Sequence, residues 1–418
     1  MAAAASPLFV GHTRFSVHQF GSRYFNATRE GDTGARFSED EYTAWLYSAE
    51  RLNPRTEIFT ELTLPQLAIA AEGFNVVHYV SFSPSLPREH REALETAAAK
   101  YSFLALNETT EVVSSTPSKK LIRAAAQKHG LTDGPVGLYR LDDDDVLSTN
   151  YFHRMAPYVT SKHIGWWVSQ GLGMASIRLG DRFVYARQYY YPKSAFGPLC
   201  IAGYQDGEVT HARAPKHTIM DHTNPTILDS REPAYFHIRH RGQDSTLGGK
   251  PEPFYPEAML RIRSQGPADL DQVRTLFPLL ADRVTTSPGI EGEAVTLAES
   301  TTLGMEELSA TWGRPGAMAL LLDFKDKRQI KRDELSVKFN ISSEGSDISC
   351  EEIKEFFASA KVYPEADGTF VAYVPFQRTG LGYLLPLEPP KGAQIEALSL
   401  HTHGQEPLFL RRLVAFPL

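Results

Sequence analysis

The stretch Gly137-Leu-Tyr-Arg-Leu-Asp-Asp-Asp-Asp145 decides the fold class of this 418-residue chain. Its first half is an apolar run typical of a buried strand, and its second half consists of four adjacent carboxylates. In an open α/β sheet, ligands bind beyond the carboxyl ends of the strands. An acidic run at an arbitrary place is usually a solvated turn, but an acidic run directly after such a strand predicts a ligand site.

Upstream of this stretch, short strand-like runs alternate with helical ones. The capping-box pattern of Ser38 and Glu41 predicts the start of the first helix. We expect strands at residues 13–17, 75–82, 103–106 and 135–141, and further helices at 55–72 (interrupted near Pro65), 87–100 and 118–129. This alternation predicts an α/β domain with a mostly parallel sheet and helices on both faces.

The character of the chain changes after Ser287-Pro288-Gly289. A last helix is predicted at 268–284, and strand-like runs separated by turn residues follow at 317–324, 335–341, 370–376 and 395–400. Short strands at this spacing favour a β-sandwich. Because the chain is longer than one hydrophobic core usually supports, we predict two domains, 1–285 and 286–418.

Composition excludes several classes of protein. A net charge of −7 gives no reason to expect a nucleic-acid partner, since a duplex-binding surface is strongly basic. Two cysteines rule out a disulfide framework and favour a reducing compartment. The N-terminus lacks signal-peptide features, and no run approaches the roughly 20 apolar residues that span a bilayer. We therefore expect a cytoplasmic protein that at most contacts a membrane surface.

The aspartate run itself suggests a metal site. Adjacent carboxylates repel one another unless a cation offsets their charge, and Mg²⁺ or Mn²⁺ prefers oxygen ligands. Because side chains alternate along a strand, Asp143 and Asp145 are predicted to enter one cleft. Ser148 is predicted to cap a helix that carries Phe152 and Met155 inward.

A second cluster of polar residues lies between residues 224 and 246. The forked donors of Arg239 and Arg241 suit phosphate oxygens. His237 and His240 alternate with these arginines, and either imidazole could complete the coordination of a metal. Each histidine alone is more often structural, but the density of His, Arg and hydroxyl residues leaves a structural and a functional role both open.

Candidates for a general base lie in the same part of the chain. Asp221 and Asp229 are the carboxylates that we select, in that order, and His217 and His222 are further candidates. The adjacent Trp166 and Trp167 fit a core position better than a sugar-stacking platform.

Together these motifs resemble a bacterial family of rhamnosyltransferases, which is similar to glycosyltransferases of the GT-A fold. The segments that carry the resemblance are Thr13-Arg-Phe-Ser-Val17, Glu50-Arg-Leu-Asn-Pro-Arg55, Tyr139-Arg-Leu-Asp-Asp-Asp-Asp-Val-Leu-Ser148, Ile227-Leu-Asp-Ser-Arg-Glu-Pro-Ala234 and Arg239-His-Arg-Gly-Gln-Asp-Ser245. The similarity covers roughly residues 8–250, and its most specific part is the aspartate run with the helix that follows.

The resemblance implies a Rossmann-type nucleotide-binding sheet and a DxD-type metal site. It places Arg14, Phe15 and Ser16 beside the nucleotide, and it implies that Asp143 and Asp145 contact the metal or the donor's ribose and diphosphate. His240 falls where many such enzymes place a late metal ligand. Where relatives carry an acidic residue that holds the base, this chain has Ser81 and Ser83, which leaves the base open.

The implied function is metal-dependent transfer of a sugar, rhamnose among the candidates, from a nucleotide-diphosphate sugar to a glycan or glycolipid acceptor. The alternatives are another Mg²⁺-dependent phosphoryl or nucleotidyl transferase and a non-enzymatic carbohydrate-binding protein. A phosphate-binding Gly-Lys-Ser/Thr loop is absent from the sequence. The sequence does not decide between inversion and retention, nor does it indicate an oligomeric state.

Overall fold

The chain divides into two compact units in the computed structural model, which describes residues 6–22, 30–31, 34–35, 37–210, 217–243, 253–304, 308–325, 331, 333–343, 348–358, 360–374, 383–404 and 406–418. Unit 1 consists of Met1–Ser176, Ala186–Leu247 and Gln265–Val284. Unit 2 consists of Ile177–Tyr185, Gly248–Ser264 and Thr285–Leu418. The main division falls after Val284, and two short segments from earlier in the chain also group with unit 2.

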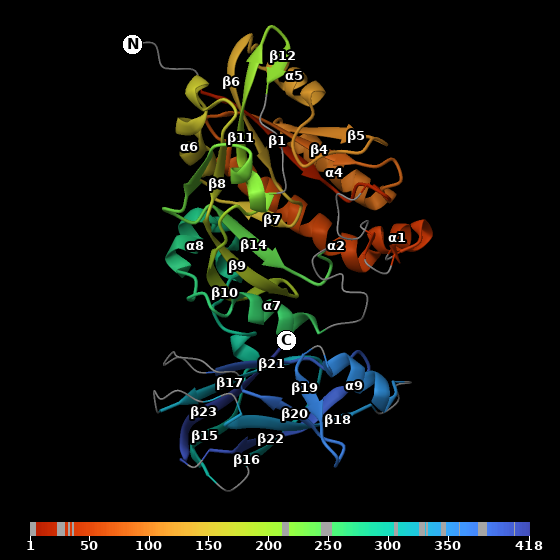
Figure 1. The fold of residues 1–418 in the computed structure, drawn as a ribbon, viewed down its shortest axis with the longest axis vertical. Helices are drawn as coiled ribbons and strands as arrows, with labels where there is room; N and C mark the ends of the chain where they lie inside the picture. The colour runs from red at the N-terminus through yellow and green to blue at the C-terminus, as the bar shows by residue number, and fades with distance from the viewer. Residues whose placement is uncertain are drawn as a thin grey trace. The chain divides into compact units, whose positions relative to one another are not determined.

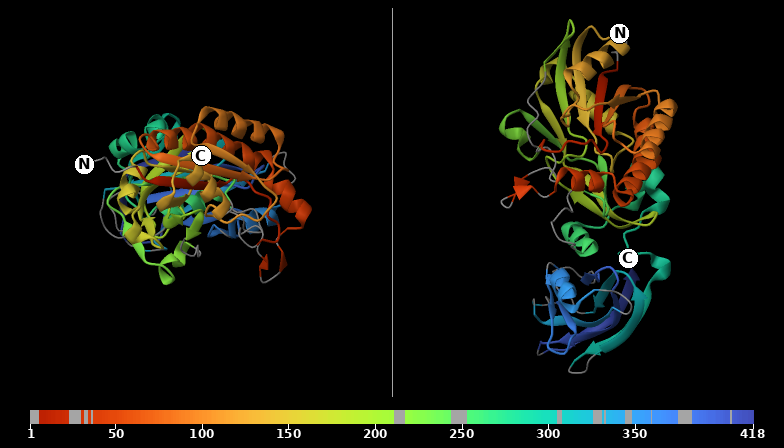
Figure 2. Two further views of the ribbon diagram at one scale, coloured as in Figure 1. Left: turned by 90° about the horizontal axis from the view of Figure 1, so that it is seen from above. Right: turned by 90° about the vertical axis from the view of Figure 1, so that its right-hand side faces the viewer.

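The main sheet of unit 1 is built around four parallel strands in the order β5-β4-β1-β6. Their bounds are β1 Leu8–Arg14, β4 Asn75–Phe82, β5 Leu104–Glu108 and β6 Asp133–Arg140. They lie side by side in Figure 1, and Figure 2 shows the red strand β1 among its orange and yellow neighbours. The chain adds β4 and β5 on one side of β1 and then returns to place β6 on the other. The strand order therefore reverses between β1 and β6, which is where doubly wound sheets bind ligands.

Further strands extend this sheet beyond β6. They are β11 Leu199–Gln205, β8 Trp167–Gln170 and β13 Thr226–Asp229, with β12 Glu208–Thr210 on the edge of β11. β11 runs antiparallel to β6 and to β8, so the sheet is mixed as a whole. The predicted α/β class is confirmed, and Trp167 is a buried core residue of β8.

The observed elements correct the first predicted strand, which was placed at 13–17. β1 begins at Leu8 and ends at Arg14, and Ser16 has a φ of 45°. That left-handed conformation is incompatible with a continuing strand. The chain therefore turns away from the sheet two residues after β1 ends.

The helices of unit 1 follow the predicted capping signals in part. Ser38 accepts a hydrogen bond from the amide of Glu41 and donates its own amide to the Glu41 carboxylate, as the capping box requires. The helices are α1 Glu39–Leu46, α2 Ala49–Glu57, the π-helical η2 Ile58–Thr63, α3 Leu64–Ala70, α4 Arg88–Lys100, α5 Lys119–Lys128, α6 Tyr151–Met155 and α8 Leu270–Leu276.

Two helix predictions were wrong in detail. The helix around Pro65 is not interrupted, because η2 widens the turn and the amide of Leu64 bonds to the carbonyl of Phe59, which accommodates the missing amide of proline. The helix predicted at 268–284 is α8 followed by the short 3₁₀ helix η7 Pro278–Arg283. The break is at Phe277, whose φ and ψ of −137° and 57° are not helical.

A second, smaller sheet has the strand order β10-β9-β14-β7. Its strands are β7 Asp145–Leu147, β9 Leu172–Leu179, β10 Arg182–Tyr190 and β14 Tyr235–Arg239. β7 and β14 are antiparallel, and their register pairs Asp145 with His237. This ladder brings the end of the aspartate run against the predicted His/Arg cluster.

Unit 2 contains two antiparallel sheets with the strand orders β15-β23-β17-β21 and β16-β22-β18-β20-β19. Their strands are β15 Val295–Leu303, β16 Leu308–Pro315, β17 Met318–Phe324, β18 Leu335–Ser342, β19 Val362–Pro364, β20 Phe370–Tyr373, β21 Tyr383–Leu387, β22 Gln394–Thr402 and β23 Leu408–Pro417. Helix α7 Phe254–Ile262 and helix α9 Cys350–Ala358 also belong to this unit. Residues 375 and 376 of the predicted strand 370–376 lie outside the described residues.

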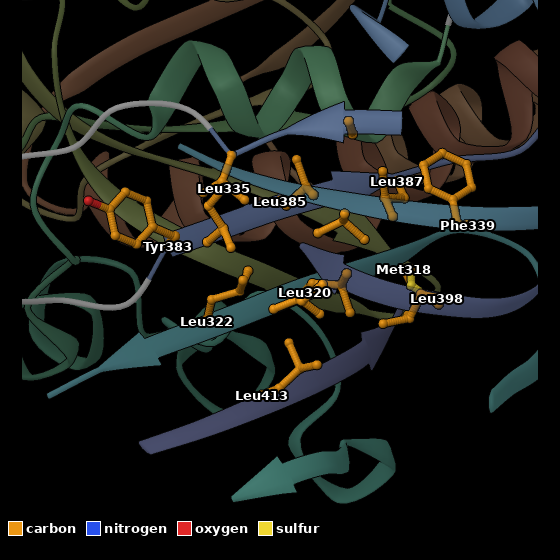
Figure 3. Close-up of a cluster of buried hydrophobic side chains, with 14 of the residues drawn as sticks. Met318, Leu320, Leu322, Leu335, Phe339, Tyr383, Leu385, Leu387, Leu398 and Leu413 are labelled. Carbon is orange, nitrogen blue, oxygen red and sulfur yellow. The ribbon is translucent and has the colours of Figure 1, made fainter. Parts of the chain in front are cut away.

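Both sheets of unit 2 contribute to one hydrophobic core. Figure 3 shows Leu320 and Leu413 from one sheet together with Leu335, Phe339 and Leu398 from the other. Burying aliphatic side chains of this size stabilises a fold by about 1.5–3 kcal/mol each. The unit thus has the core of its own that an independent domain needs.

Among the described residues, no helix has the length and apolar character needed to cross a membrane.

Candidate functional site

The aspartate run forms a buried turn at the carboxyl end of β6. Asp143, Asp144 and Asp145 are 3%, 6% and 1% exposed. Asp142 turns back and accepts two hydrogen bonds from Arg140, at 2.8 and 2.7 Å. Only Asp145 belongs to a strand, so the alternation on which the prediction for Asp143 and Asp145 was based does not apply. The turn buries three successive carboxylates instead.

The helix after the run is not capped by Ser148. Its N-cap residue is Asn150, and the Ser148 hydroxyl donates to the Asn150 side chain at 2.8 Å. The predicted inward positions are correct, because Phe152 and Met155 are fully buried. α6 therefore anchors the chain after the aspartate run through its apolar face.

Helix α2 brings two buried arginines to the site. Arg55 forms an ion pair with Asp143 and reaches Asp144 Oδ2 at 3.4 Å, while its Nε donates to the carbonyl of Gly242 at 3.2 Å. One turn earlier, Arg51 donates to the Ser16 hydroxyl at 2.8 Å. Residues four apart lie on the same face of a helix, so α2 presents both guanidiniums to the carboxyl ends of β1 and β6.

The chain after β14 closes the other side of the run. His237 Nδ1 lies 2.7 Å from Asp145 Oδ1, and His240 Nε2 lies 3.2 Å from Asp144 Oδ2. Gln243 also donates to Asp144 Oδ2 at 3.2 Å. A Cβ on Gly242 would stand 3.1 Å from the Arg51 Cα. Glycine therefore permits the close approach that lets Arg55 reach the backbone here.

Burial and charge separate the pKa values of these carboxylates. Burial raises the pKa of Asp143 to about 6, although Arg55 opposes the shift. Burial acts in the same direction on Asp144, but Arg55 and the hydrogen bond from His240 outweigh it and hold its pKa well below the ordinary value. Burial raises the pKa of Asp145 and lowers that of His237 to about 3. Asp144 is therefore the carboxylate that stays charged most persistently.

The residues predicted beside the nucleotide lie at the carboxyl ends of β1 and β4. Ser16 contacts Arg51, and thus connects to the site, while Arg14 is the last residue of β1 and pairs in register with Ser81. Phe15 is fully buried against Phe59, with ring centroids 5.7 Å apart, so it is a core residue.

A buried polar network lies beneath this end of the sheet. Ser81 Oγ accepts from Asn107 at 2.8 Å and lies 2.8 Å from His12 Nε2. Thr13 donates to the Leu141 carbonyl at 2.7 Å, so His78 Nε2 must donate to Thr13, at 2.9 Å. The other ring nitrogen of His78 is then an acceptor. Burial lowers the pKa of His12 to about 4 and that of His78 to about 3, so both are neutral.

The two candidates for a general base have other partners. Asp229 is buried between Arg154 at 3.0 Å and Arg231 at 2.9 Å, and the hydrogen bond from Arg231 holds its pKa well below the ordinary value. Asp221 lies on the short helix η5 His217–His222 and pairs with Lys193 at 2.9 Å. None of these contacts links either carboxylate to the aspartate run.

Of the remaining predicted site residues, Arg239 is buried at the end of β14 and Arg241 is exposed. The three residues predicted to bind a metal do not converge on one point. Asp143 contacts Arg55, Asp145 contacts His237, and His240 contacts Asp144. In the part of the chain that the structure describes, no group of three or more His, Cys, Asp or Glu side chains is arranged to hold a metal. The residues present therefore do not fit the predicted three-ligand site.

Sequence reasoning missed Arg55, the residue with the most direct contacts to the run. Its signal is visible in Arg51-Leu-Asn-Pro-Arg55, where two arginines share a helix face with the buried Leu52. Arginine on the apolar face of a helix is rarely buried without an acidic partner. The pattern indicates a buried ion pair but does not identify the carboxylate.

With this geometry in view, comparison with known proteins finds a family match over the N-terminal part of the chain. Residues 9–190 match the family model described as "Putative rhamnosyl transferase". The resemblance seen in the motifs is confirmed over this segment, which contains the four parallel strands, α2 and the aspartate run. It ends before β14, so His237 and His240 lie outside the matched residues. No curated protein matches the chain significantly.

Three solved structures show only distant similarity. S. aureus TarS 1–349 in complex with UDP-GlcNAc is 12% identical over 66% of this chain and 71% of its own, with a TM-score of 0.28. A longer S. aureus TarS structure is 11% identical over 97% and 77%, with a TM-score of 0.25. A Bacillus anthracis structure titled "Putative Glucose-1-Phosphate Thymidylyltransferase", in complex with a sucrose, is 6% identical over 63% and 98%, with a TM-score of 0.24. Similarity at this level carries no information about the activity of this chain.

Proposed function

We propose that the protein is a glycosyltransferase that moves a sugar from a nucleotide-diphosphate sugar to a carbohydrate or glycolipid acceptor. The observation that carries the proposal is the buried aspartate run, which lies at the reversal of strand order in a segment that matches a rhamnosyltransferase family. This is the position at which doubly wound sheets bind nucleotides. Rhamnose is the donor sugar that the family description favours.

The proposed chemistry is substitution at the anomeric carbon. An acceptor hydroxyl oxygen forms the new bond, the bond to the donor's diphosphate oxygen breaks, and the hydroxyl proton leaves to a base. Negative charge develops on the departing diphosphate, and stabilising that charge is the largest catalytic contribution expected. Arg239 and Arg241 are the proposed diphosphate-binding residues, because guanidinium forks match phosphate oxygens.

Asp143 is the proposed contact for a hydroxyl of the donor. Its Oδ1 is held by Arg55, whereas its Oδ2 is buried and has no hydrogen-bond partner among the described residues. An unpaired buried carboxylate oxygen is costly unless a ligand satisfies it. Ser16, held by Arg51, and Ser81 are proposed to flank the nucleoside at the ends of β1 and β4.

Asp221 remains the proposed base if the reaction inverts, because it is exposed, whereas Asp229 is held between two guanidiniums.

Unit 1 is proposed to be a GT-A-like catalytic domain, and the two sheets of unit 2 are proposed to form a β-sandwich accessory domain. The boundary proposed near residue 285 needs the addition of Ile177–Tyr185 and Gly248–Ser264, which group with unit 2.

The test is a donor screen in which UDP-, GDP- and dTDP-sugars are incubated with glycan and glycolipid acceptors and the release of nucleoside diphosphate is measured. We expect acceptor-dependent release from one nucleotide class and a loss of about 100-fold or more in Asp143→Asn, comparable to the removal of one stabilising group in other active sites. Arg154→Lys, which alters a buried Arg–Asp pair elsewhere in unit 1, is the matched control. Failure of folded protein to bind any of UDP, GDP or dTDP would contradict the proposal.

A further inference from the structure

Arginines offset most of the negative charge of the aspartate run. Three guanidiniums act on its four carboxylates: Arg55 and Arg51 on Asp143, Arg55 again on Asp144, and Arg140 on Asp142 and Asp145. Arg51 and Arg55 come from α2, and Arg140 is the last residue of β6. The cluster therefore does not need a metal to offset the repulsion between its carboxylates.

Arg55 bridges two carboxylates of the run, one of which, Asp143, is a predicted metal ligand. It contacts Asp143 and Asp144 at once, and its side chain is only 7% exposed. Its Nε donates to the Gly242 carbonyl at 3.2 Å, which gives the guanidinium a further fixed contact. Breaking a buried pair of this kind leaves uncompensated charge, which proteins tolerate poorly.

We propose that the guanidinium of Arg55 takes the role of the divalent cation at this site, so that the protein binds its donor without a metal. This inference rests on the proposed function where it concerns binding of the donor. Whether the site binds a metal can be measured on the protein without any donor. Arg55 is a positioning residue, since it acts by neutralising and holding Asp143 and Asp144. The positive charge toward the diphosphate comes from Arg239 and Arg241, the proposed diphosphate-binding residues.

The first measurement titrates Mn²⁺ into the full-length protein and follows free Mn²⁺ by electron paramagnetic resonance. We expect no stoichiometric binding to the wild type. In Arg55→Ala the two carboxylates lose their cation, so we expect Mn²⁺ binding to appear together with a Mn²⁺-dependent rise in Tm. Stoichiometric Mn²⁺ binding by the wild type that Asp143→Asn abolishes would overturn the inference, whether or not a nucleotide binds.

The second measurement is calorimetric titration of UDP, GDP and dTDP in EDTA and in Mn²⁺. We expect one nucleotide to bind with an affinity that changes by less than about twofold between the two conditions. Binding that EDTA abolishes would overturn the inference while supporting the proposed function. If no nucleotide binds in either condition, the proposed function fails and the Mn²⁺ titration still decides the role of Arg55.

Arg55→Lys covers the case in which Arg55→Ala does not fold. Lysine keeps the charge but cannot bridge two carboxylates and a carbonyl with a planar fork. We expect nucleotide affinity about tenfold weaker than in the wild type, and still independent of metal. Arg154→Lys should leave both nucleotide affinity and the metal response unchanged, since its partner is Asp229. An equal loss of affinity in both variants would show a general effect on folding and contradict the assigned role.

Discussion

At the scale of single residues, identical side chains acquire different properties from their neighbours. Burial raises the pKa of Asp143 to about 6, whereas Arg55 and His240 hold the pKa of Asp144, beside it in sequence, well below its ordinary value. Burial in the sheet likewise lowers the pKa of His12 and keeps its imidazole neutral. Burial favours the uncharged form, and a nearby opposite charge favours the charged one.

The buried histidines predict a loss of stability in mild acid. His12 has a pKa of about 4 in the folded protein and an ordinary value of 6.5. The unfolded state therefore binds more protons between these values, so stability is full above pH 6.5 and falls as pH drops toward 4. For His12 alone the loss reaches about 3 kcal/mol by pH 4.

Urea unfolding of His12→Gln at pH 7 and pH 4.5 measures this contribution. We expect the variant to lose about 2 kcal/mol less stability between these pH values than the wild type. His222→Gln, on the surface, should follow the wild type. Identical pH dependence in His12→Gln and the wild type would show that this imidazole is not held neutral by the fold.

At the scale of elements, the parallel strands pack so closely that one position admits only glycine. A Cβ on Gly11 of β1 would stand 2.2 Å from Tyr139 Cζ and 2.3 Å from His78 Nδ1, both in fully buried side chains. We expect Gly11→Ala to destabilise unit 1 by about 3 kcal/mol or more, the upper end for overpacking. Thermal unfolding checks this, with Gly266→Ala as the control because nothing lies within 4 Å of its Cβ position. Equal Tm values for the two variants would contradict the close packing of β1 on β4 and β6.

At the scale of the whole molecule, unit 2 includes a segment that precedes the 285 boundary. α7 buries Phe254, Tyr255, Met259 and Ile262, and the amide of Tyr255 donates to Glu388 at 2.8 Å. We therefore expect the fragment 248–418 to unfold at a higher Tm than the fragment 286–418, because the shorter one exposes the apolar surface that α7 covers. Circular dichroism during heating distinguishes them, and equal Tm values would place α7 outside the cooperative unit.

Local patterns alone were enough to locate much of unit 1 and the position of its site. The strand at 75–82, the capping box at Ser38 and the carboxyl-end position of the aspartate run follow from the sequence, because strand periodicity and helix capping depend on neighbouring residues. The contacts of the run depend on the tertiary structure. Arg55 lies 88 positions before Asp143, and His237 lies 92 positions after Asp145. Only folding brings these residues together and buries them. Burial and the neighbouring charges then decide which carboxylate stays charged, and whether a guanidinium or a metal offsets that charge.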